Sequence, residues 1–223
     1  MLFTPFLPFD NAVFQWIANV FAPGTSAALD WFFNFVTMLG NSGWFWIVLA
    51  LLFLIPNRTR KIGVIMAFAL ILELLIVNIT MKPLFDRPRP YDLELDWWIQ
   101  AYQAVFPNGA LAGHMPSDMS FPSGHAAISF AGAMAWCFGS RREWVGRARW
   151  VSYIGIVTAA LTAFSRLYLG VHYASDVIGG VLVGILCALL AVLLFKLIEK
   201  GFDRKVNAPW SRFTEKRLPS VFW

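Results

Sequence analysis

The class of fold is decided by residues 174–197, which read ASDVIGGVLVGILCALLAVLLFKL. Between Asp176 near the start and Lys196 near the end, this stretch carries no charged side chain. An α-helix needs about 20 predominantly apolar residues to cross the hydrocarbon core of a bilayer. The composition agrees, because 58% of the 223 residues are hydrophobic and only 14% are charged, whereas about a quarter are charged in soluble domains. We therefore expect an all-α, multi-spanning membrane protein.

Five further apolar segments predict the other spans. They lie at residues 25–40, 43–56, 63–81, 124–139 and 150–164. With residues 174–197 they predict a bundle of about six transmembrane helices, although several segments are shorter than the roughly 20 residues that a span needs. Segment 25–40 contains polar residues such as Asp30 and Asn34, so a re-entrant or interfacial helix is the alternative there.

The two ends of the chain differ from the bundle. Residues 11–21 carry apolar side chains at helical spacing, which predicts an interfacial amphipathic helix within an N-terminal part, residues 1–24. We expect the transmembrane domain at residues 25–200 and a basic cytoplasmic tail at residues 201–223. The N-terminus lacks the basic region of a cleavable signal peptide, so we expect no segment to be removed.

The basic residues indicate the orientation of the bundle. Of the 18 Lys and Arg residues, 14 lie in loop 57–62, in loop 140–149 and from Lys196 onward. Cytoplasmic loops carry an excess of Lys and Arg, so these regions are expected in the cytoplasm. The four basic residues expected on the extracytoplasmic side are Lys82, Arg87, Arg89 and Arg166. The net charge of +5 thus reflects topology, and we expect no nucleic-acid partner.

Candidate chemistry begins with a histidine and a carboxylate near the last apolar segment. His172 and Asp176 are four residues apart, so on a helix they would share one face. A carboxylate that accepts from one ring nitrogen fixes the tautomer and leaves the other nitrogen as a nucleophile or base. Arg166 ends the preceding apolar segment and can reach the same pocket. The alternative is an ordinary capping and packing pair at a helix start.

A second polar stretch, Pro122-Ser123-Gly124-His125, opens another apolar segment. Proline suits a helix start, glycine permits close approach of the backbone, and the first amide groups of a helix are unpaired. Such a helix start attracts anions, and the Ser123 hydroxyl adds a donor. His125 lies in the first turn and faces the same opening. A helix N-terminus merely capped by Ser123 is the alternative.

The third stretch, Lys82-Pro-Leu-Phe-Asp-Arg-Pro-Arg89-Pro90, follows segment 63–81. Its prolines force a rigid, extended course. The planar fork of Arg89 and the point charge of Lys82 both suit phosphate oxygens. The alternative is that these residues are interfacial anchors that reach the lipid headgroups, and this alternative fits Arg87 best.

Together the three stretches follow the pattern K-x6-R-P, P-S-G-H and S-R-x5-H-x3-D. In this pattern the chain resembles the type 2 phosphatidic acid phosphatase superfamily of integral membrane lipid phosphatases. The resemblance covers residues 25–197. It implies that His172 is a nucleophile that forms a phosphohistidine, that Asp176 orients it, and that His125 protonates the leaving oxygen. The residues that it implies for phosphate binding are Lys82, Arg89, Ser123, Gly124 and Arg166. It also implies that neither a metal nor another cofactor is needed.

The motifs touch only the phosphoryl group and therefore leave the substrate open. Hydrolysis of undecaprenyl diphosphate at the outer face of the cell membrane is the first expectation, ahead of phosphatidylglycerophosphate, phosphatidate and lipid A phosphatases. A lipid phosphotransferase is a second enzymatic alternative. A lipid-binding or transport protein is the non-enzymatic one, but its ionisable residues would lie near the midplane of the membrane, whereas these cluster at one surface. The expected partners are a lipid phosphate and the bilayer; the oligomeric state is left open.

Other residues lie outside the motifs. Glu73 is a carboxylate within a predicted span, where a functional role and a hydrogen bond to a neighbouring helix are both possible. Gly180 and Gly184 are spaced for close helix packing, within one chain or between copies. Cys137 and Cys187 lie in apolar segments and are expected to be small core residues.

The loop after Pro90 contains one further periodic segment. Residues 93–106 predict a helix on the outer surface beside the site, with interfacial anchoring as its role and a lid as the alternative. Its apolar stripe consists of Leu93, Trp97, Ala101 and Val105, with Trp98 and Tyr102 beside it. His114, in the same loop, is expected to be a surface histidine.

Overall fold

The computed structural model describes residues 2–113, 115–143 and 148–206, and the regular structure within these parts is helical throughout. His114, loop residues 144–147 and the tail from residue 207 lie outside the described residues. The α-helices are α1 (Leu7–Phe21), α2 (Ala27–Met38), α3 (Trp44–Leu54), α4 (Arg60–Glu73), α5 (Lys82–Phe85), α6 (Asp96–Val105), α7 (Gly124–Glu143), α8 (Ala148–Tyr168) and α9 (Ala174–Val206). Two short 3-10 turns, η1 (Thr4–Phe6) and η2 (Asn41–Gly43), precede α1 and α3, and a π-helix, η3 (Leu74–Met81), joins α4 to α5.

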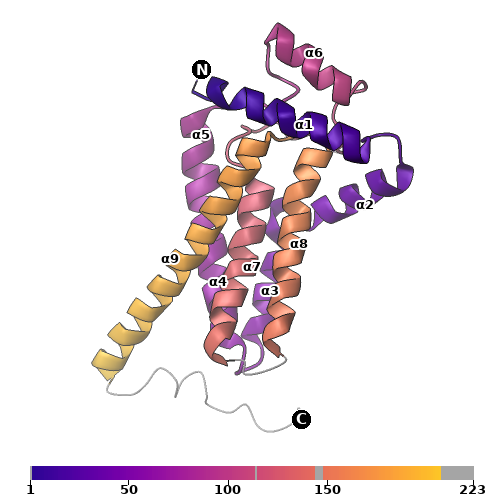
Figure 1. Ribbon diagram of the computed structural model, residues 1–223. Coiled ribbons are helices and arrows are strands. Elements are labelled where there is room, and N and C mark those ends of the chain that lie inside the picture. The colour runs from indigo at the N-terminus through magenta and orange to yellow at the C-terminus, as the bar shows by residue number, and fades with distance from the viewer. Residues whose placement is uncertain (1, 114, 144–147, 207–223) are drawn as a thin grey trace.

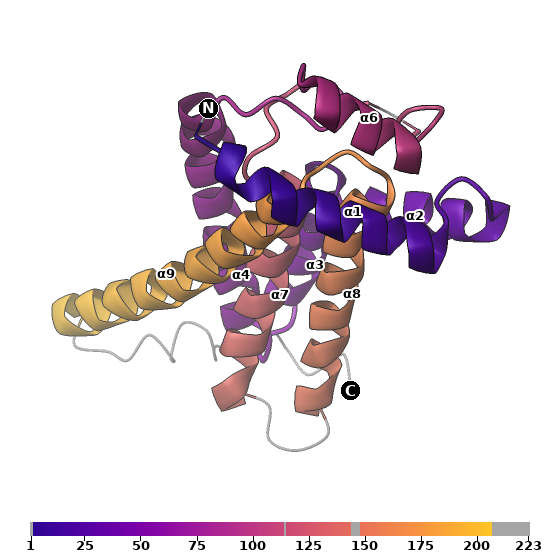
Figure 2. The ribbon, with the colours of Figure 1, turned by 45° about the horizontal axis from the view of Figure 1, so that its top comes forward.

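The long helices form a bundle around α7, which contacts α4, α8 and α9 (Figure 1). α3 packs on α4, and α2 packs on α8. α1 and α6 contact each other and lie across one end of the bundle (Figures 1 and 2). The N-terminal part is thus a helix, as the sequence predicted, but it is built into the fold, since Phe14 and Ile17 are buried.

The number of spans differs from the prediction. Three helical stretches are long and apolar enough to cross a membrane among the described residues: 60–85, which runs through α4, η3 and α5, 150–168 in α8, and 174–201 in α9. α2 and α3 qualify only as a pair, bent by 46°, so three or four candidate spans are identified by length and composition in the described chain, which matches the predicted number of about six only roughly. A helix of 11 or 12 residues, as α2 and α3 are, is only about 18 Å long, whereas the hydrocarbon core is about 30 Å thick.

Helix α7 runs alongside the candidate spans in the centre of the bundle. Three neighbouring helices enclose it, so its first four turns contain small side chains such as Ala126, Ala127, Ala131 and Ala133, all fully buried. Helix α9 continues to Val206, into the region predicted as the basic tail.

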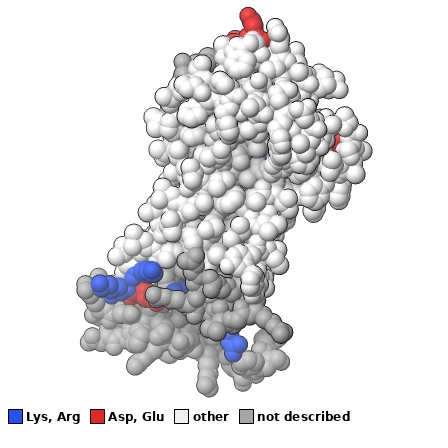
Figure 3. All heavy atoms as spheres, viewed as in Figure 1, with Lys and Arg blue, Asp and Glu red and all other residues white. Residues whose placement is uncertain are grey.

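The two ends of the bundle differ in charge. On the face seen in Figure 3, the described Lys and Arg side chains gather at the lower end, where an acidic patch lies beside them, and other acidic side chains lie at the upper end, with a nearly uncharged surface between the two ends. The lower end carries loop 57–62 and the far end of α9, and the upper end carries α1 and α6 (Figure 1). This distribution agrees with a multi-pass membrane protein whose basic loops share one side.

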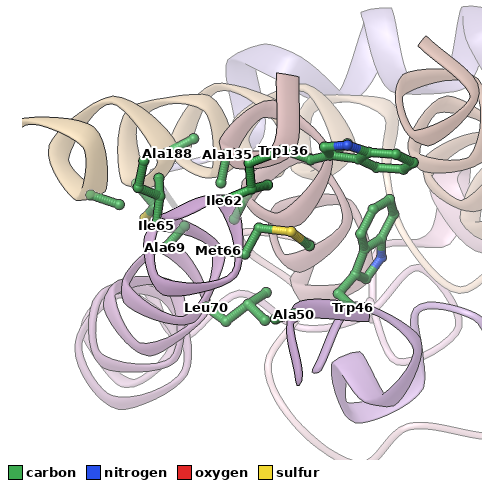
Figure 4. Close-up of a cluster of buried hydrophobic side chains, with 14 of the residues drawn as sticks. Trp46, Ala50, Ile62, Ile65, Met66, Ala69, Leu70, Ala135, Trp136 and Ala188 are labelled. Atoms are coloured by element: carbon green, nitrogen blue, oxygen red, sulfur yellow. The ribbon is translucent and has the colours of Figure 1, made fainter. Parts of the chain in front are cut away.

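The core beside the site is built from α3, α4, α7 and α9. Trp46, Met66 and Trp136 lie at its centre (Figure 4), and Trp46 Nε1 donates a hydrogen bond of 3.2 Å to Ser129 Oγ. Cys137 and Cys187 are both buried free thiols, which confirms that they are core residues.

Two glycines let α9 approach the first turns of α7. A Cβ atom on Gly180 would lie 2.4 Å from the carbonyl oxygen of Ser123, and one on Gly184 would lie 2.3 Å from that of Ala127. The close packing that the sequence predicted is therefore made within one chain. It holds the helix start that contains Ser123 and His125 against the helix that contains Asp176.

We expect Gly180→Ala to lower both stability and activity. The added methyl group meets backbone and forces α9 away from α7, which costs about 1–3 kcal/mol for an overpacked contact. Gly201→Ala is the matched control, because nothing lies within 4 Å of a Cβ at Gly201 in the same helix. Thermal unfolding in detergent measures the difference between the two variants. Equal melting temperatures would contradict the packing role of Gly180.

Candidate active site

The residues singled out by the three motifs meet at the end of the bundle that carries α1 and α6. Lys82 begins α5, Gly124 begins α7, Arg166 lies in the last turn of α8, and Asp176 lies in the first turn of α9. A cavity of about 380 Å³ lies between them. Its lining includes Lys82, Arg89, Gly124, His125, Arg166 and His172. A second cavity, of about 640 Å³, is lined by α2, residues 112–113 and residues 116–118, and it shares His125 and Arg166 with the first.

His172 is buried at the centre of this arrangement, with 1% of its surface exposed. Its Nε2 atom lies 2.9 Å from Arg89 Nη1. Because a guanidinium can only donate, Nε2 accepts this bond and the ring proton is placed on Nδ1. Burial lowers the pKa of His172 well below its ordinary value of 6.5, and the charges of Arg89, Arg166 and Lys82 lower it further. The imidazole is therefore neutral at neutral pH, with the Nε2 lone pair on the cavity side.

Asp176 faces the other nitrogen of His172, but not in the way that the spacing predicted. His172 lies before the start of α9, so the two residues meet across a helix N-terminus instead of sharing one helical face. The distance from His172 Nδ1 to Asp176 Oδ2 is 3.5 Å. Ser120 Oγ lies 3.4 Å from the same nitrogen and donates a 2.5 Å hydrogen bond to Asp176 Oδ2. Sequence reasoning missed Ser120, which lies just before the second motif.

Lys82 and Arg89 are bridged by a carboxylate that the sequence analysis also missed. Asp118 pairs with Lys82 through Oδ2 and with Arg89 through Oδ1, the latter at 2.6 Å. Burial acts to raise the pKa of Asp118, but its hydrogen bonds to Lys82 and the charges of Lys82 and Arg89 outweigh burial and hold that pKa below its usual value. An anion is thus already bound between the two cations. The site is therefore one in which a negative group is stabilised by fixed positive charge.

Besides the two carboxylate oxygens of Glu73, three buried polar atoms at or beside the cavity lack a hydrogen-bond partner in the described part of the chain. They are Ser123 Oγ, His125 Nε2 and Arg166 Nε. Arg166 is held at its other end, where Nη1 donates a 2.6 Å hydrogen bond to Thr37 Oγ1 of α2. Buried polar atoms are almost always paired, so a group of unpaired ones at one cavity indicates a bound polar ligand. Their placement beside Lys82 and Arg89 indicates an anionic one.

A comparison with known protein families agrees with the motifs and with this anion site. Residues 62–199 match the PAP2 superfamily. The chain therefore belongs to the PAP2 superfamily.

Individual relatives agree with this assignment. The chain is 31% identical over 157 residues to the undecaprenyl-diphosphatase of Sulfolobus acidocaldarius, which covers 70% of this chain and 66% of the relative. It is 34% identical over 143 residues to phosphatidylglycerophosphatase B of Bacillus subtilis, which covers 62% of each chain. The chain thus spans slightly less than two thirds of the length of each of these relatives. The crystal structure of LpxE from Aquifex aeolicus is similar in fold, with a TM-score of 0.61, 28% identity, and coverage of 82% of this chain and 93% of that chain.

One residue of this PAP2 protein was wrongly interpreted from its sequence. Arg87 fitted an interfacial anchor best, yet it is 3% exposed. Its guanidinium pairs with Asp176 Oδ1 and, at 2.8 Å, with Asp10 Oδ2. It also lies between the rings of Phe3 and Tyr173, 4.5 and 3.8 Å from their centroids. The anchor interpretation failed because its two carboxylate partners come from distant parts of the chain.

The buried face of α6 matches the predicted stripe only in part, since Leu93 and Val105 are buried. Trp97 is exposed, whereas Trp98 and Tyr102 are buried. The Tyr102 hydroxyl donates a 2.9 Å hydrogen bond to the carbonyl of Gly170, in the loop that carries His172. α6 therefore supports the loop that carries His172. The predicted bounds of 93–106 shorten to 96–105.

Glu73 also lines the first cavity. It is fully buried, and neither carboxylate oxygen has a hydrogen-bond partner in the described chain. The expected bond to a neighbouring helix is therefore not formed. The π-helix η3 follows directly, with hydrogen bonds between residues five apart. Glu73, Asn78 and Lys82 all line the same cavity.

Proposed function

We propose that this PAP2 protein hydrolyses a lipid phosphate or diphosphate through a phosphohistidine on His172. The observation that carries the proposal is the set of unpaired polar atoms on Ser123, His125 and Arg166 around the cavity that His172 lines. Lys82, Arg89 and Arg166 supply fixed positive charge for the phosphoryl oxygens. Phosphoryl transfer depends mainly on such positioning and charge stabilisation.

The first half of the reaction forms the covalent intermediate. The lone pair of His172 Nε2 attacks phosphorus, and the bond between phosphorus and the leaving oxygen breaks. His125 in its protonated form gives its proton to that oxygen, which leaves as an alcohol or a phosphate. Asp176, 3.5 Å from Nδ1, stabilises the positive charge that develops on the ring. Arg89 must release Nε2 before attack and can then turn to the phosphoryl oxygens.

The second half returns the enzyme to its starting state. His125, now neutral, takes a proton from a water molecule as its oxygen attacks phosphorus. The bond between phosphorus and Nε2 breaks, its electron pair returns to His172, and inorganic phosphate leaves. An alcohol of a second lipid in place of water would give a phosphotransferase, the alternative that uses the same groups.

We propose undecaprenyl diphosphate as the substrate, with undecaprenyl phosphate as the product. Similarity to the Sulfolobus undecaprenyl-diphosphatase supports this choice. A phosphatidylglycerophosphatase is the second candidate and is supported by the similarity to the Bacillus enzyme. For either lipid, the second cavity offers apolar side chains of α2 beside the shared residue His125, namely Trp31, Phe35 and Met38.

Phosphate release from a panel of purified lipids tests the assignment. The panel contains undecaprenyl diphosphate, phosphatidylglycerophosphate, phosphatidate and lipid A, each in mixed micelles with and without an added acceptor lipid. We expect the highest kcat/KM with the first, no phosphorylated acceptor, and full activity in excess EDTA, because three cations already offset the substrate charge. Faster phosphate release from another lipid would assign that lipid as the substrate instead. Loss of activity in EDTA that magnesium restores would contradict the mechanism.

We further propose that the site faces the extracytoplasmic side, because the described Lys and Arg side chains of Figure 3 gather at the opposite end of the bundle. Two single cysteines, Ser117→Cys and Asn57→Cys, report this after Cys137 and Cys187 are replaced. Ser117 is exposed in the loop beside the site, and Asn57 lies in the basic loop. We expect a membrane-impermeant thiol reagent to label position 117 in intact spheroplasts and position 57 only after permeabilisation. The reverse pattern would place the site in the cytoplasm.

A further inference from the structure

A carboxylate of the N-terminal helix reaches the catalytic centre from outside the family match. Asp10 lies in the first turn of α1, whereas the match to the PAP2 superfamily covers residues 62–199. Its side chain is fully buried. Oδ2 pairs with Arg87 Nη2 at 2.8 Å and accepts a 2.9 Å bond from Ser175 Oγ, while Oδ1 accepts a 2.8 Å bond from the amide of Ser175. Asp10 thus binds both Arg87, which pairs with Asp176, and Ser175, which directly precedes Asp176 in the chain.

These contacts form a continuous buried chain to the nucleophile. Arg87 Nη1 binds Asp176 Oδ1 and also donates to Ser175 Oγ at 2.8 Å. The other oxygen of Asp176 faces His172 Nδ1. Arg87 therefore holds one oxygen of Asp176 so that the other remains directed at the imidazole.

The charges of this chain explain why a second carboxylate is present. Arg87 alone would neutralise Asp176 and weaken its attraction for the proton on His172 Nδ1. With Asp10 included, two carboxylates share one guanidinium, and a net negative charge remains beside the ring. A buried guanidinium that loses one carboxylate partner is also free to turn, and the interaction is strong because few water molecules can screen it.

Helix α1 is packed firmly enough to fix the position of Asp10. Phe14 and Ile17 are buried in a cluster with Trp98 and Tyr173. The Phe14 ring lies 5.8 Å from that of Trp98 between centroids, and Trp98 lies 5.1 Å from Tyr173. Tyr173 in turn covers Arg87. The helix, the guanidinium and the loop that carries His172 are therefore one packed unit.

We propose that Asp10 is a positioning residue of this phosphatase. It acts through Arg87 to orient Asp176 and to keep a net negative charge beside His172. The inference rests on the proposed phosphohistidine mechanism. It predicts that Asp10 influences the rate of the chemical step and leaves the anion pocket of Lys82, Arg89 and Arg166 unchanged.

The test uses the full-length protein and the lipid phosphate that the wild type hydrolyses fastest. Asp10→Asn keeps the size of the side chain and the acceptor for the Ser175 amide but removes the charge. We expect kcat to fall about tenfold or more, as for other groups that orient a catalytic side chain through hydrogen bonds without contacting the substrate. The KM and the inhibition constant for orthovanadate should stay within about twofold, because the phosphate-binding cations are untouched. Asp96→Asn, an exposed carboxylate in α6, is the control and should change nothing.

A double-mutant cycle shows whether Asp10 acts through Arg87. If it does, adding Asp10→Asn to Arg87→Met should cost less than about twofold further activity, since the path is already broken. Unchanged kcat in Asp10→Asn, multiplicative losses in the double variant, or a loss of orthovanadate binding equal to the loss of kcat would each overturn the proposal. Orthovanadate binding also reports whether the variants fold. A wild-type enzyme active on another lipid but not on undecaprenyl diphosphate would overturn only the substrate assignment.

Discussion

His172→Ala is expected to abolish phosphate release while orthovanadate still binds the cations. The substitution removes the nitrogen that forms the covalent bond, and the loss of a nucleophile costs about 10⁴-fold or more in kcat. Neutral imidazole is the reactive form, and its pKa lies well below 6.5 through burial and then the charges of Arg89, Arg166 and Lys82. The neutral form of His172 should therefore remain available as the pH falls through 6.5, and protonation of this ring should limit the rate only at lower pH.

The measurement is trapping of the phosphorylated enzyme. Lipid labelled with radioactive phosphate is mixed with enzyme, and the reaction is quenched in alkali. Phosphohistidine survives alkali, so label should remain on the wild-type protein and be absent from His172→Ala. Asp92→Asn, an exposed carboxylate outside the cavity, controls for handling and should trap label normally. Most of the activity surviving in His172→Ala would rule out the covalent mechanism.

His125→Asn is expected to give the second largest loss, and the size of the loss should depend on the leaving group. A general acid contributes about 10²–10⁴-fold when the leaving oxygen needs a proton. An aryl phosphate leaves without one, so the first half of the reaction should be nearly normal with that substrate. The second half still needs His125 to activate water, and the phosphohistidine should therefore accumulate.

Rapid quenching separates the two halves of the reaction. With an aryl phosphate, His125→Asn should release one equivalent of phenol in a burst, followed by slow turnover. With an alkyl lipid phosphate, neither burst nor turnover should be seen. Equal losses with both substrates would show that His125 only binds phosphate and does not transfer a proton.

The motif residues could be located from the sequence because each motif is short and sits at a helix end. Local spacing sets which side chains a helix start presents, so Lys82, Ser123, His125 and Arg166 were all placed correctly at one end of the bundle. The supporting groups could not be found in this way. Asp10, Ser120 and Asp118 gain their partners only through tertiary contacts, and a lone acidic residue or serine has no local pattern that distinguishes it from a surface residue.

The fold was predictable in class but less so in detail. Apolar runs identify helices in a bilayer well, because backbone polar groups must be satisfied within the helix. Apolar length alone does not reveal a bend, so the sequence could not show that segments 25–40 and 43–56 form two short helices, α2 and α3, with a 46° bend between them. Enclosure also changes the expected composition, since α7 packs on protein around most of its surface and needs fewer large apolar residues than a lipid-facing helix.

The contact between Asp10 and Ser175 has a consequence for the order of events during biosynthesis. The two residues are 165 positions apart, and at about 5–20 residues per second their synthesis is separated by roughly 8–33 s. Throughout that interval Asp10 lacks its Ser175 partner, and α1 can rest at the surface of the membrane as an amphipathic segment. The ion network closes only when the last span has been inserted. A nascent chain that stops before α9 therefore contains two complete motifs and most of the third but lacks Asp176, and we expect it to be inactive.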